Sequence, residues 1–312
     1  MLGCGAPFAP SVGLVDGMRI GPDVAPSWGN PSETGNEQPQ GLHRAVRSTL
    51  ANAWMHGQLW ANDPDCLMLR ARQSELTEAE VQSWSAIVAL SGGMVLLSDD
   101  MGLLESEQER VAVLARTLPP SNLAAVPLGP HVDGIASRAQ LTVERSWEHW
   151  LIAALFNWGE QEVEVVFNPT DWDMPGELYH LYDLFSGQHL GPLSGSADLA
   201  LLPVHGVRLL AAHEDAGRPQ FVGSTLHLLG GVVELSEEAW ADDTLTLGLN
   251  CPGERTGDLA VYIPPGFRYK GVDTTAETVT IHMQGKSLLV ISLRLVNTAL
   301  ITIQFTREGA QG

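Results

Sequence analysis

Three groups of charged and polar side chains follow short apolar runs in the first hundred residues, and their types are suited to acid–base chemistry. They are Arg19 with Asp23; Asn62 with Asp63 and Asp65; and Ser98 with Asp99 and Asp100. In a parallel α/β protein, the residues that follow the strands meet at one end of the sheet, where active sites lie. Glycoside hydrolysis needs carboxylates gathered in this way, because one acts as an acid and another as a base or nucleophile. The three groups therefore predict a hydrolytic site.

Each group also has an interpretation that involves no catalysis. The sequence at 63–65 is an ordinary Asp-Pro turn, and Asp99 with Asp100 could cap the start of a helix. Arg19 could form a plain ion pair with Asp23. A divalent metal is another use of clustered carboxylates, but neither EF-hand spacing nor a His-Glu-x-x-His sequence occurs, so we expect no metal. No glycine-rich phosphate or dinucleotide motif stands in a suitable context, so we expect no cofactor.

The charge balance excludes two classes of partner. Asp and Glu total 37 against 17 Lys and Arg, which gives a formal net charge of −20. Nucleic acids and anionic membrane surfaces bind basic proteins, so we expect neither as a partner. No apolar run is long enough for a membrane-spanning helix.

Two further features bear on the cellular compartment. The first residues lack a basic segment followed by an apolar one, so they do not form a secretory signal, and we expect a cytoplasmic location. Three cysteines (Cys4, Cys66 and Cys251) have no C-x-x-C spacing and predict neither a disulfide framework nor a zinc site.

Residues 1–120 alternate between short apolar runs and segments with helical periodicity. Over 41–56, one helical face carries apolar residues: Leu42, Val46, Leu50, Ala53 and Trp54. Capping boxes at 77–80 and 106–109 predict two more helices, and the apolar run at 94–97 predicts a fully buried strand. This alternation predicts parallel strands joined by crossover helices in a domain over 1–125.

From residue 138 the apolar residues recur with period two. Strand-like segments lie at 140–147, 149–158, 161–168, 177–185, 199–211, 221–235, 243–249, 258–263, 276–283, 287–294 and 299–306. Short, evenly spaced strands predict an antiparallel β-sandwich over 138–312, after a linker rich in Pro and Gly. The predicted fold class is α/β followed by all-β.

Tryptophan is unusually frequent, with nine residues in the chain. Its flat apolar face and single N–H donor are suited to sugar rings. Four of those in the β-rich part support a sugar-binding role: Trp147, Trp150, Trp158 and Trp172. Trp150 and Trp158 have the same parity along one strand, which fits an exposed stacking platform or a core face. A non-catalytic carbohydrate-binding or interaction protein is therefore the alternative function.

Four distinctive strings occur in order in the first part of the chain: LGCGAP at 2–7, VDGMRIGPDVAPSW at 15–28, LWANDPDCL at 59–67, and SGGM with LSDD within 91–100. Over roughly the first 120 residues, the chain resembles the melibiase-type α-galactosidases. The resemblance implies the C-terminal half of a (β/α)8 (TIM) barrel, strands five to eight, followed by an antiparallel β-domain. It also implies hydrolysis of terminal α-linked galactose in oligosaccharides with retention of configuration.

The resemblance implies a role for six residues. Asp23, in an Arg-x-x-x-Asp motif, matches the catalytic acid/base carboxylate. The implied substrate-binding residues are Arg19, Asp65, Cys4, Gly5 and Trp28. Of these, Arg19 lies near the acid/base carboxylate in the family, and Asp65 matches a carboxylate at the end of barrel strand seven. Trp28 stands in a loop, where packing is an equally good explanation.

The sequence departs from the family in the other half of the catalytic pair. The family's nucleophile is an aspartate in a Lys-x-Asp motif, but Lys270 and Lys286 are each followed two positions later by an apolar residue. The family's paired aspartates before Gly-Trp are also missing. We therefore expect a fragment of a longer enzyme, inactive alone, or a chain whose partner is the N-terminal half of the barrel or another copy in a homo-oligomer. Whether the sugar is galactose or N-acetylgalactosamine stays open.

Overall fold

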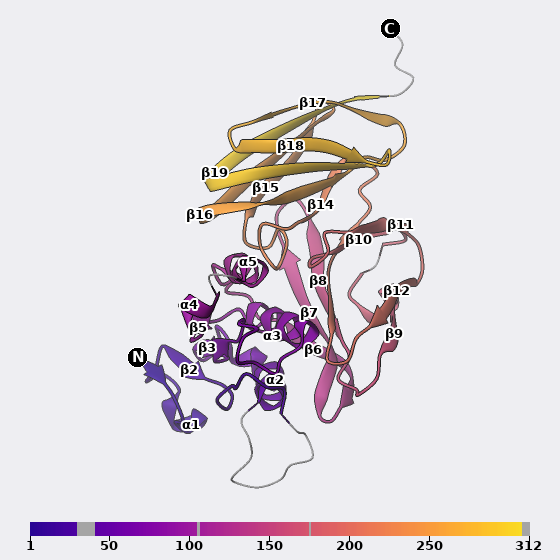
Figure 1. Ribbon diagram of the computed structural model, residues 1–312. Coiled ribbons are helices and arrows are strands. Elements are labelled where there is room, and N and C mark those ends of the chain that lie inside the picture. Colours follow the sequence, from indigo (N-terminus) through magenta and orange to yellow (C-terminus); the bar gives the residue numbers. More distant parts are fainter. Residues whose placement is uncertain (30–40, 105–106, 175, 308–312) are drawn as a thin grey trace. The chain divides into compact units, whose positions relative to one another are not determined.

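The computed structural model describes residues 1–29, 41–104, 107–174 and 176–307. Strands form most of its regular structure, and helices are few (Figure 1). The chain divides into two compact units. One comprises Met1–Leu141, Ala153–Phe167 and Asp198–Leu209, and the other comprises Thr142–Ile152, Asn168–Ala197 and Leu210–Gly312.

Short parallel strands and helices alternate in the first part of the chain. The strands are β1 (Leu2–Gly3), β2 (Gly17–Arg19), β3 (Ala61–Asp63), β4 (Cys66–Leu67) and β5 (Leu96–Leu97). The helices are α1 (Phe8–Ser11), α2 (Leu42–Ala51), α3 (Glu78–Leu90), α4 (Met101–Leu104) and α5 (Gln108–Thr117), with a 3-10 turn, η1 (Ala53–Met55). β2 pairs in parallel with both β1 and β3, and β4 pairs in parallel with β5. The predicted parallel pairing is confirmed, whereas the half barrel stays a prediction.

Helix α3 begins at the capping box that its sequence predicts. The Thr77 hydroxyl accepts a hydrogen bond from the Glu80 N–H, and the Glu80 carboxylate accepts one from the Thr77 N–H at 2.7 Å. Ser106, from the second predicted box, lies outside the described residues. No helix in the described part of the chain has the length and apolar character needed to cross a membrane.

Two predictions of burial in this region are wrong. Leu42, Val46, Leu50 and Ala53 are buried, but Trp54 is 59% exposed. Helix α2 ends at Ala51, so the helical spacing that placed Trp54 on the apolar face no longer applies. Strand β5 is half-buried rather than fully buried.

An antiparallel sheet follows, together with two shorter strands. Its order is β11 (His189–Leu193), β10 (Tyr179–Asp183), β13 (Val207–Glu214), β8 (His149–Phe156), β7 (Ile135–Glu144) and β6 (Val126–Val132). β9 (Val163–Phe167) pairs with β12 (Ala197–Leu202), and η2 (Pro169–Asp171) is a 3-10 turn. β7, β8 and β13 each contain residues of both units.

Strand β6 lies where the sequence predicts a linker. It contains Pro127, Gly129 and Pro130 and pairs only with β7, with a register shift between Leu128 and His131. Proline is tolerated in an edge strand, because the N–H that it lacks faces away from the sheet. The residues that suggested a linker are therefore compatible with this strand.

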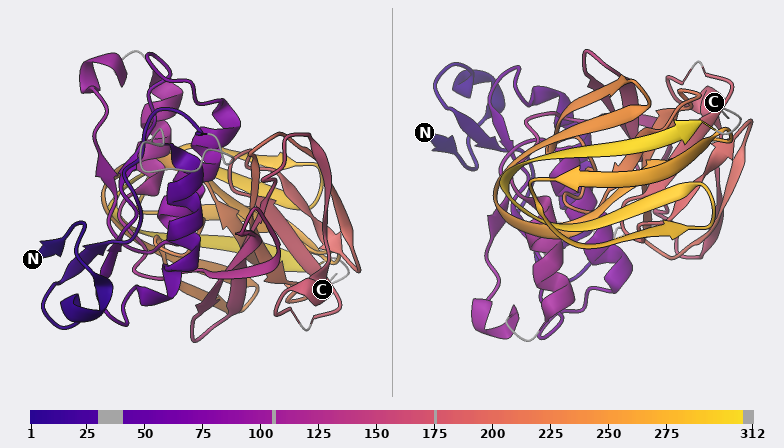
Figure 2. Two further views of the ribbon diagram at one scale, coloured as in Figure 1. Left: turned by 90° about the horizontal axis from the view of Figure 1, so that it is seen from below. Right: turned by 90° about the horizontal axis from the view of Figure 1, so that it is seen from above.

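The C-terminal sheet is organised around one long antiparallel pair (Figure 1). β16 (Thr244–Tyr262) pairs with β19 (Leu288–Arg307) along nearly its whole length. β15 (Leu235–Ala241) and β14 (Gln220–Ser224) both pair with β16, while β17 (Phe267–Thr274) and β18 (Glu277–Gln284) both pair with β19. The first half of β16 and the last half of β19 thus belong to one four-stranded layer, and their other halves belong to a second. Figure 2 shows the curvature of the long strands.

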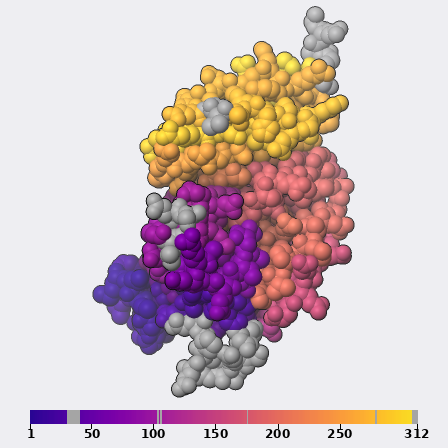
Figure 3. Space-filling view, viewed as in Figure 1, coloured from indigo at the N-terminus to yellow at the C-terminus, as the bar shows by residue number. Residues whose placement is uncertain are grey.

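The two layers enclose a core built from alternate positions. Each long strand contributes inward residues on both sides of its bend: Leu245, Leu247, Leu249, Leu259 and Val261 from β16, and Leu289, Ile291, Leu293, Ile301 and Ile303 from β19. The space-filling view shows residues of this sheet forming a continuous packed surface (Figure 3). The antiparallel arrangement is confirmed, but the predicted segments 243–249 and 258–263 are parts of one strand. The turn-like residues between them form a bulge between Cys251 and Glu254.

A pair of histidines lies in the antiparallel sheet, in the second unit: His180 is buried and His189 is half-buried. His180 Nδ1 is 3.0 Å from Nε2 of His189, and His180 Nε2 is 3.3 Å from Oδ2 of Asp215. Burial lowers the pKa of His180 to about 4 against the opposing charge of Asp215. Burial also lowers the pKa of His189 to about 4, reinforced by the charges of His180 and His213. Both rings are therefore neutral in the folded protein near pH 7.

We expect this pair to make the fold sensitive to mild acid. The unfolded chain protonates its histidines near pH 6.5, whereas the folded pair does so only near pH 4. Stability is therefore complete above pH 6.5 and is lost as the pH falls toward 4, by about 2 kcal/mol per histidine at pH 5. In urea denaturation, His189→Gln should lose about 2 kcal/mol less than the wild type between pH 7 and pH 5. Exposed His282→Gln is the control, and equal losses in wild type and His189→Gln would contradict the assignment.

Candidate functional site

The carboxyl ends of β2 and β3 bring two of the predicted groups together. Arg19 is in register with Asp63 on the neighbouring parallel strand, so the last side chains of both strands are adjacent. Arg19 Nε lies 3.0 Å from Oδ2 of Asp63. Arg19 Nη1 lies 2.9 Å from Oδ2 of Asp65 and 3.2 Å from Oδ1 of Asp23. One guanidinium thus binds three carboxylates, and we call these four residues the Arg19 cluster.

Two carboxylates of the Arg19 cluster are buried and held by backbone hydrogen bonds. The side chains of Asp63 and Asp65 are 0% and 8% exposed. Asp63 accepts a hydrogen bond from the Asp65 N–H at 2.9 Å. Asp65 accepts one from the Cys66 N–H at 2.8 Å and one from the Val24 N–H at 2.9 Å. These two carboxylates therefore fix Arg19 and the start of the loop that follows Asp23.

Asp23 is the exposed member of the cluster. Its side chain is 65% exposed, whereas that of Arg19 is 14% exposed. A carboxylate in this position can exchange a proton with a bound ligand or accept a hydrogen bond from a hydroxyl group. The geometry therefore combines one accessible carboxylate with a rigid, positively charged neighbour.

The guanidinium keeps its charge in this surrounding. Burial opposes ionisation of Arg19, but the hydrogen bond to Asp63 and the charges of Asp63 and Asp65 outweigh it and raise the pKa of Arg19. β1 pairs in parallel with β2, with Gly3 opposite Met18, so Cys4 and Arg19 follow at the same end of the sheet.

Cys66 and Ser98 border the cluster as well. The Cys66 thiol has hydrogen-bonding contacts with the side chains of both Ser98 and Asp65. Burial raises the pKa of Cys66, the contact with Ser98 opposes this shift, and the contact with Asp65 adds to it. The thiol is therefore a protonated donor near neutral pH rather than a nucleophile.

The aspartates of the third predicted group have different partners. Asp99 accepts hydrogen bonds from the N–H groups of Leu69 and Arg70 at 2.6 and 3.0 Å, and from the Arg70 side chain at 2.8 Å. Asp100 accepts one from the Gly102 N–H at the start of α4. Asp99 thus holds the loop after β4, and Asp100 supports the helix start that the sequence left as a structural alternative.

The remaining predicted site residues differ in exposure. Cys4 and Gly5 directly follow β1 and are exposed, and Gly5 adopts the left-handed φ of +65° with open space around it. Trp28 is only 8% exposed, and its ring stacks on His205 at 4.1 Å and on Trp158 at 5.9 Å. This position favours packing, the alternative left open above, and the sugar contact of Trp28 stays a prediction.

Two residues at the cluster had no individual role in the sequence prediction. Asp63 was predicted only as a member of the second group, and its contact with Arg19 follows from strand register, which is visible once the strands are paired. Cys66 was predicted only as part of the string at 59–67. The described residues contain no group of three or more His, Cys, Asp or Glu arranged to hold a metal ion.

Comparison with known proteins finds a shared fold. No protein-family model matches the sequence. α-Galactosidase I from Mortierella vinacea is similar with a TM-score of 0.51 and 17% identity, over 67% of this chain and 56% of that chain. A GH27 β-L-arabinopyranosidase from Geobacillus stearothermophilus, solved with arabinose, has a TM-score of 0.50 and 13% identity, over 64% of this chain and 46% of that chain. The chain thus shares its fold with about half the length of these two glycosidases.

A third solved structure is similar over a shorter stretch. An α-galactosidase from Thermus thermophilus, solved in complex with p-nitrophenyl α-D-galactopyranoside, is 34% identical with a TM-score of 0.36. The match covers 45% of this chain and 28% of that chain.

Proposed function

We propose that this chain supplies the acid/base half of a retaining glycoside hydrolase that releases terminal α-linked galactose. The observation that carries the proposal is the Arg19 cluster, in which Asp23 is accessible while Asp63 and Asp65 are buried. The shared fold with glycosidases supports the general class. The motif order around Arg19 and Asp23 supports the α-galactosidase assignment.

The proposed chemistry assigns one role to each member of the cluster. Asp23 gives its proton to the glycosidic oxygen as the bond breaks and then takes a proton from the water that completes hydrolysis. Arg19 positions Asp23 and contacts the sugar, while Asp63 and Asp65 hold Arg19. Cys4 and Gly5 line the adjoining part of the sugar pocket in this proposal.

Retention requires a second carboxylate about 5 Å from the first, which attacks the anomeric carbon. Neither Lys270 nor Lys286 begins the family's nucleophile motif. We therefore assign the nucleophile to a separate segment that completes the barrel. In this proposal β1, β2, β3 and β5 are barrel strands five to eight within residues 1–125, and residues 138–312 form the β-domain.

An assay of the chain alone and with a complementing segment tests this division of roles. We expect the isolated chain to release no nitrophenol from 4-nitrophenyl α-galactoside above the uncatalysed rate. Co-expression with the part of a homologous α-galactosidase that this chain does not cover should restore turnover. Turnover by the isolated chain that disappears in Asp23→Asn would contradict the assignment of the nucleophile, and a complemented enzyme without turnover would contradict the proposed reaction.

The alternative function in carbohydrate binding has less support from the tryptophans than their spacing suggested. Trp150, Trp158 and Trp172 are 1%, 5% and 6% exposed. Trp150 and Trp158 therefore lie in the core, which is the second of the two interpretations of their spacing. Trp147 is different, because it lines a pocket.

A further inference from the structure

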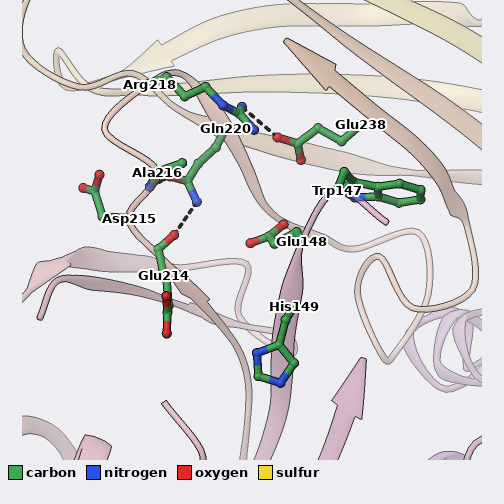
Figure 4. Close-up of a pocket in the computed structure, with 9 residues that line it drawn as sticks. All are labelled: Trp147, Glu148, His149, Glu214, Asp215, Ala216, Arg218, Gln220 and Glu238. Atoms are coloured by element: carbon green, nitrogen blue, oxygen red, sulfur yellow. Dashed lines mark hydrogen bonds and ion pairs between the residues drawn. The ribbon is translucent and has the colours of Figure 1, made fainter. Parts of the chain in front are cut away.

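A pocket in the second unit is unrelated to the Arg19 cluster. Its volume is about 340 Å³, within the range of small-ligand sites. Its walls come from the start of β8, from the end of β13 with the segment leading into β14, and from one residue of β15 (Figure 4). The lining side chains that determine which ligand fits are Trp147, Glu148, Glu214, Asp215, Arg218 and Glu238.

Glu238 presents an unused hydrogen-bond acceptor in this pocket. Its side chain is 2% exposed, and its Oε1 lies 3.0 Å from Nη1 of Arg218. Its Oε2 is buried and has no hydrogen-bond partner among the described residues. Figure 4 shows the carboxyl group directed toward the middle of the pocket, between Arg218 and Glu148. Burial and the nearby charge of Glu148 raise the pKa of Glu238. A proton on the carboxyl group, or a hydrogen-bond donor at Oε2, would therefore stabilise it.

Trp147 supplies the complementary group. It is half-buried at the pocket, and its indole N–H, a donor, also has no partner among the described residues. The pocket therefore has one unused acceptor and one unused donor beside an aromatic ring.

Hydrogen bonds within the protein hold the other side chains that line the pocket in place. Glu148 Oε1 lies 2.7 Å from Nδ1 of His213, and Glu214 accepts a hydrogen bond from the Gly176 N–H at 3.0 Å. Gln220 donates to the Glu214 carbonyl at 2.8 Å and accepts from the Ala216 N–H. A pocket with fixed walls loses little conformational entropy when it binds a ligand.

The charges and unused groups select a ligand class. Four carboxylates against one guanidinium disfavour an anion. An ammonium group could satisfy Glu238 but offers no acceptor to the indole N–H of Trp147. A hydroxyl group both donates and accepts, and the C–H face of a sugar ring packs well against an aromatic ring.

We propose that this pocket binds one ring of a neutral, polyhydroxylated ligand, namely a hexopyranose, at a site separate from the Arg19 cluster. A ring hydroxyl donates to Glu238 Oε2, and Trp147 packs against the sugar. The inference does not depend on the proposed hydrolase function, because it uses none of the residues of the Arg19 cluster.

Isothermal titration calorimetry of the full chain with D-galactose and D-glucose tests the site. We expect dissociation constants of about 1–10 mM for at least one hexose, as is usual for a single ring with few contacts. Trp147→Ala and the nearly isosteric Glu238→Gln should each weaken binding about tenfold or more. Glu237→Gln, the exposed neighbour on β15, should leave it unchanged.

Three outcomes would overturn the inference. The first is that the folded wild-type chain binds neither hexose at a hexose concentration of about 50 mM. The second is binding that Asp23→Asn abolishes and the pocket variants leave intact, which would place the sugar at the Arg19 cluster instead. The third is binding of ethylammonium, but of neither hexose, with loss in Glu238→Gln, which would make the pocket a cation site. Circular dichroism of each variant verifies that its fold is retained.

Discussion

Asparagine in place of Asp23 should lower hydrolysis of melibiose by the complemented enzyme roughly 100- to 10,000-fold, the usual contribution of a general acid. Asn keeps the shape of the side chain and can still accept a hydrogen bond from Arg19, but it has no proton to give to the departing sugar oxygen. The Asp23 side chain is 65% exposed and Asn can keep its 3.2 Å contact with Arg19, so the variant should fold. Initial rates with melibiose measure the effect.

The leaving group supplies the control for this experiment. A dinitrophenolate departs without a proton, so the bond-breaking step on dinitrophenyl α-galactoside should be far less affected by Asp23→Asn than on melibiose. Pre-steady-state release of the phenol isolates this step. Equal losses on both substrates would mean that Asp23 does not act as the acid, and would leave it a positioning role at most.

Methionine in place of Arg19 should destabilise the first unit by about 3–5 kcal/mol, because it leaves buried carboxylates without their counter-charge. Asp63 and Asp65 are almost completely inaccessible and bond directly to this guanidinium. Urea denaturation followed by far-UV circular dichroism measures the loss. Arg19→Lys should be intermediate, because it restores the charge but not the separate donors that reach Asp63 and Asp65.

Two comparisons make this result specific. Combining Arg19→Met with Asp63→Asn and Asp65→Asn removes the buried charges and should recover part of the lost stability. Arg294 binds Glu254 and Glu277 at 2.6 and 2.7 Å, but all three side chains are substantially exposed, so Arg294→Met should have a far smaller effect. Similar losses for Arg19→Met and Arg294→Met would show that burial of the Arg19 cluster contributes little.

Local signals in the sequence predicted the parts of this structure that depend on few neighbours. The Thr77–Glu80 capping box needs only one helical turn, and it starts α3 as expected. The grouping of Arg19 with Asp65 follows from the rule that parallel strands end together, and their contact at 2.9 Å agrees with it. The separate role of Asp63 depends on strand register, which no local pattern encodes.

The failures have a common physical cause in strand pairing and burial, which the residue types alone do not specify. Pro127 and Pro130 suggested a linker, but their positions on an edge strand leave the missing N–H groups harmless. The Pro-Gly sequence after Cys251 is compatible with a turn or a bulge, and pairing with β19 selects the bulge. The open acceptor of Glu238 was not predictable, because it depends on the burial of a strand residue beside Arg218.

The long pair β16 and β19 has a consequence for how the C-terminal sheet comes apart. Each layer takes its two central strands from the same pair, so neither layer contains a complete set of strands of its own. Opening one layer would expose the apolar residues of the other, and the backbone pairing runs without interruption from one layer into the next except at the bulge. The two layers therefore form one cooperative folding unit, in which partial opening is confined to the outer strands β14, β15, β17 and β18.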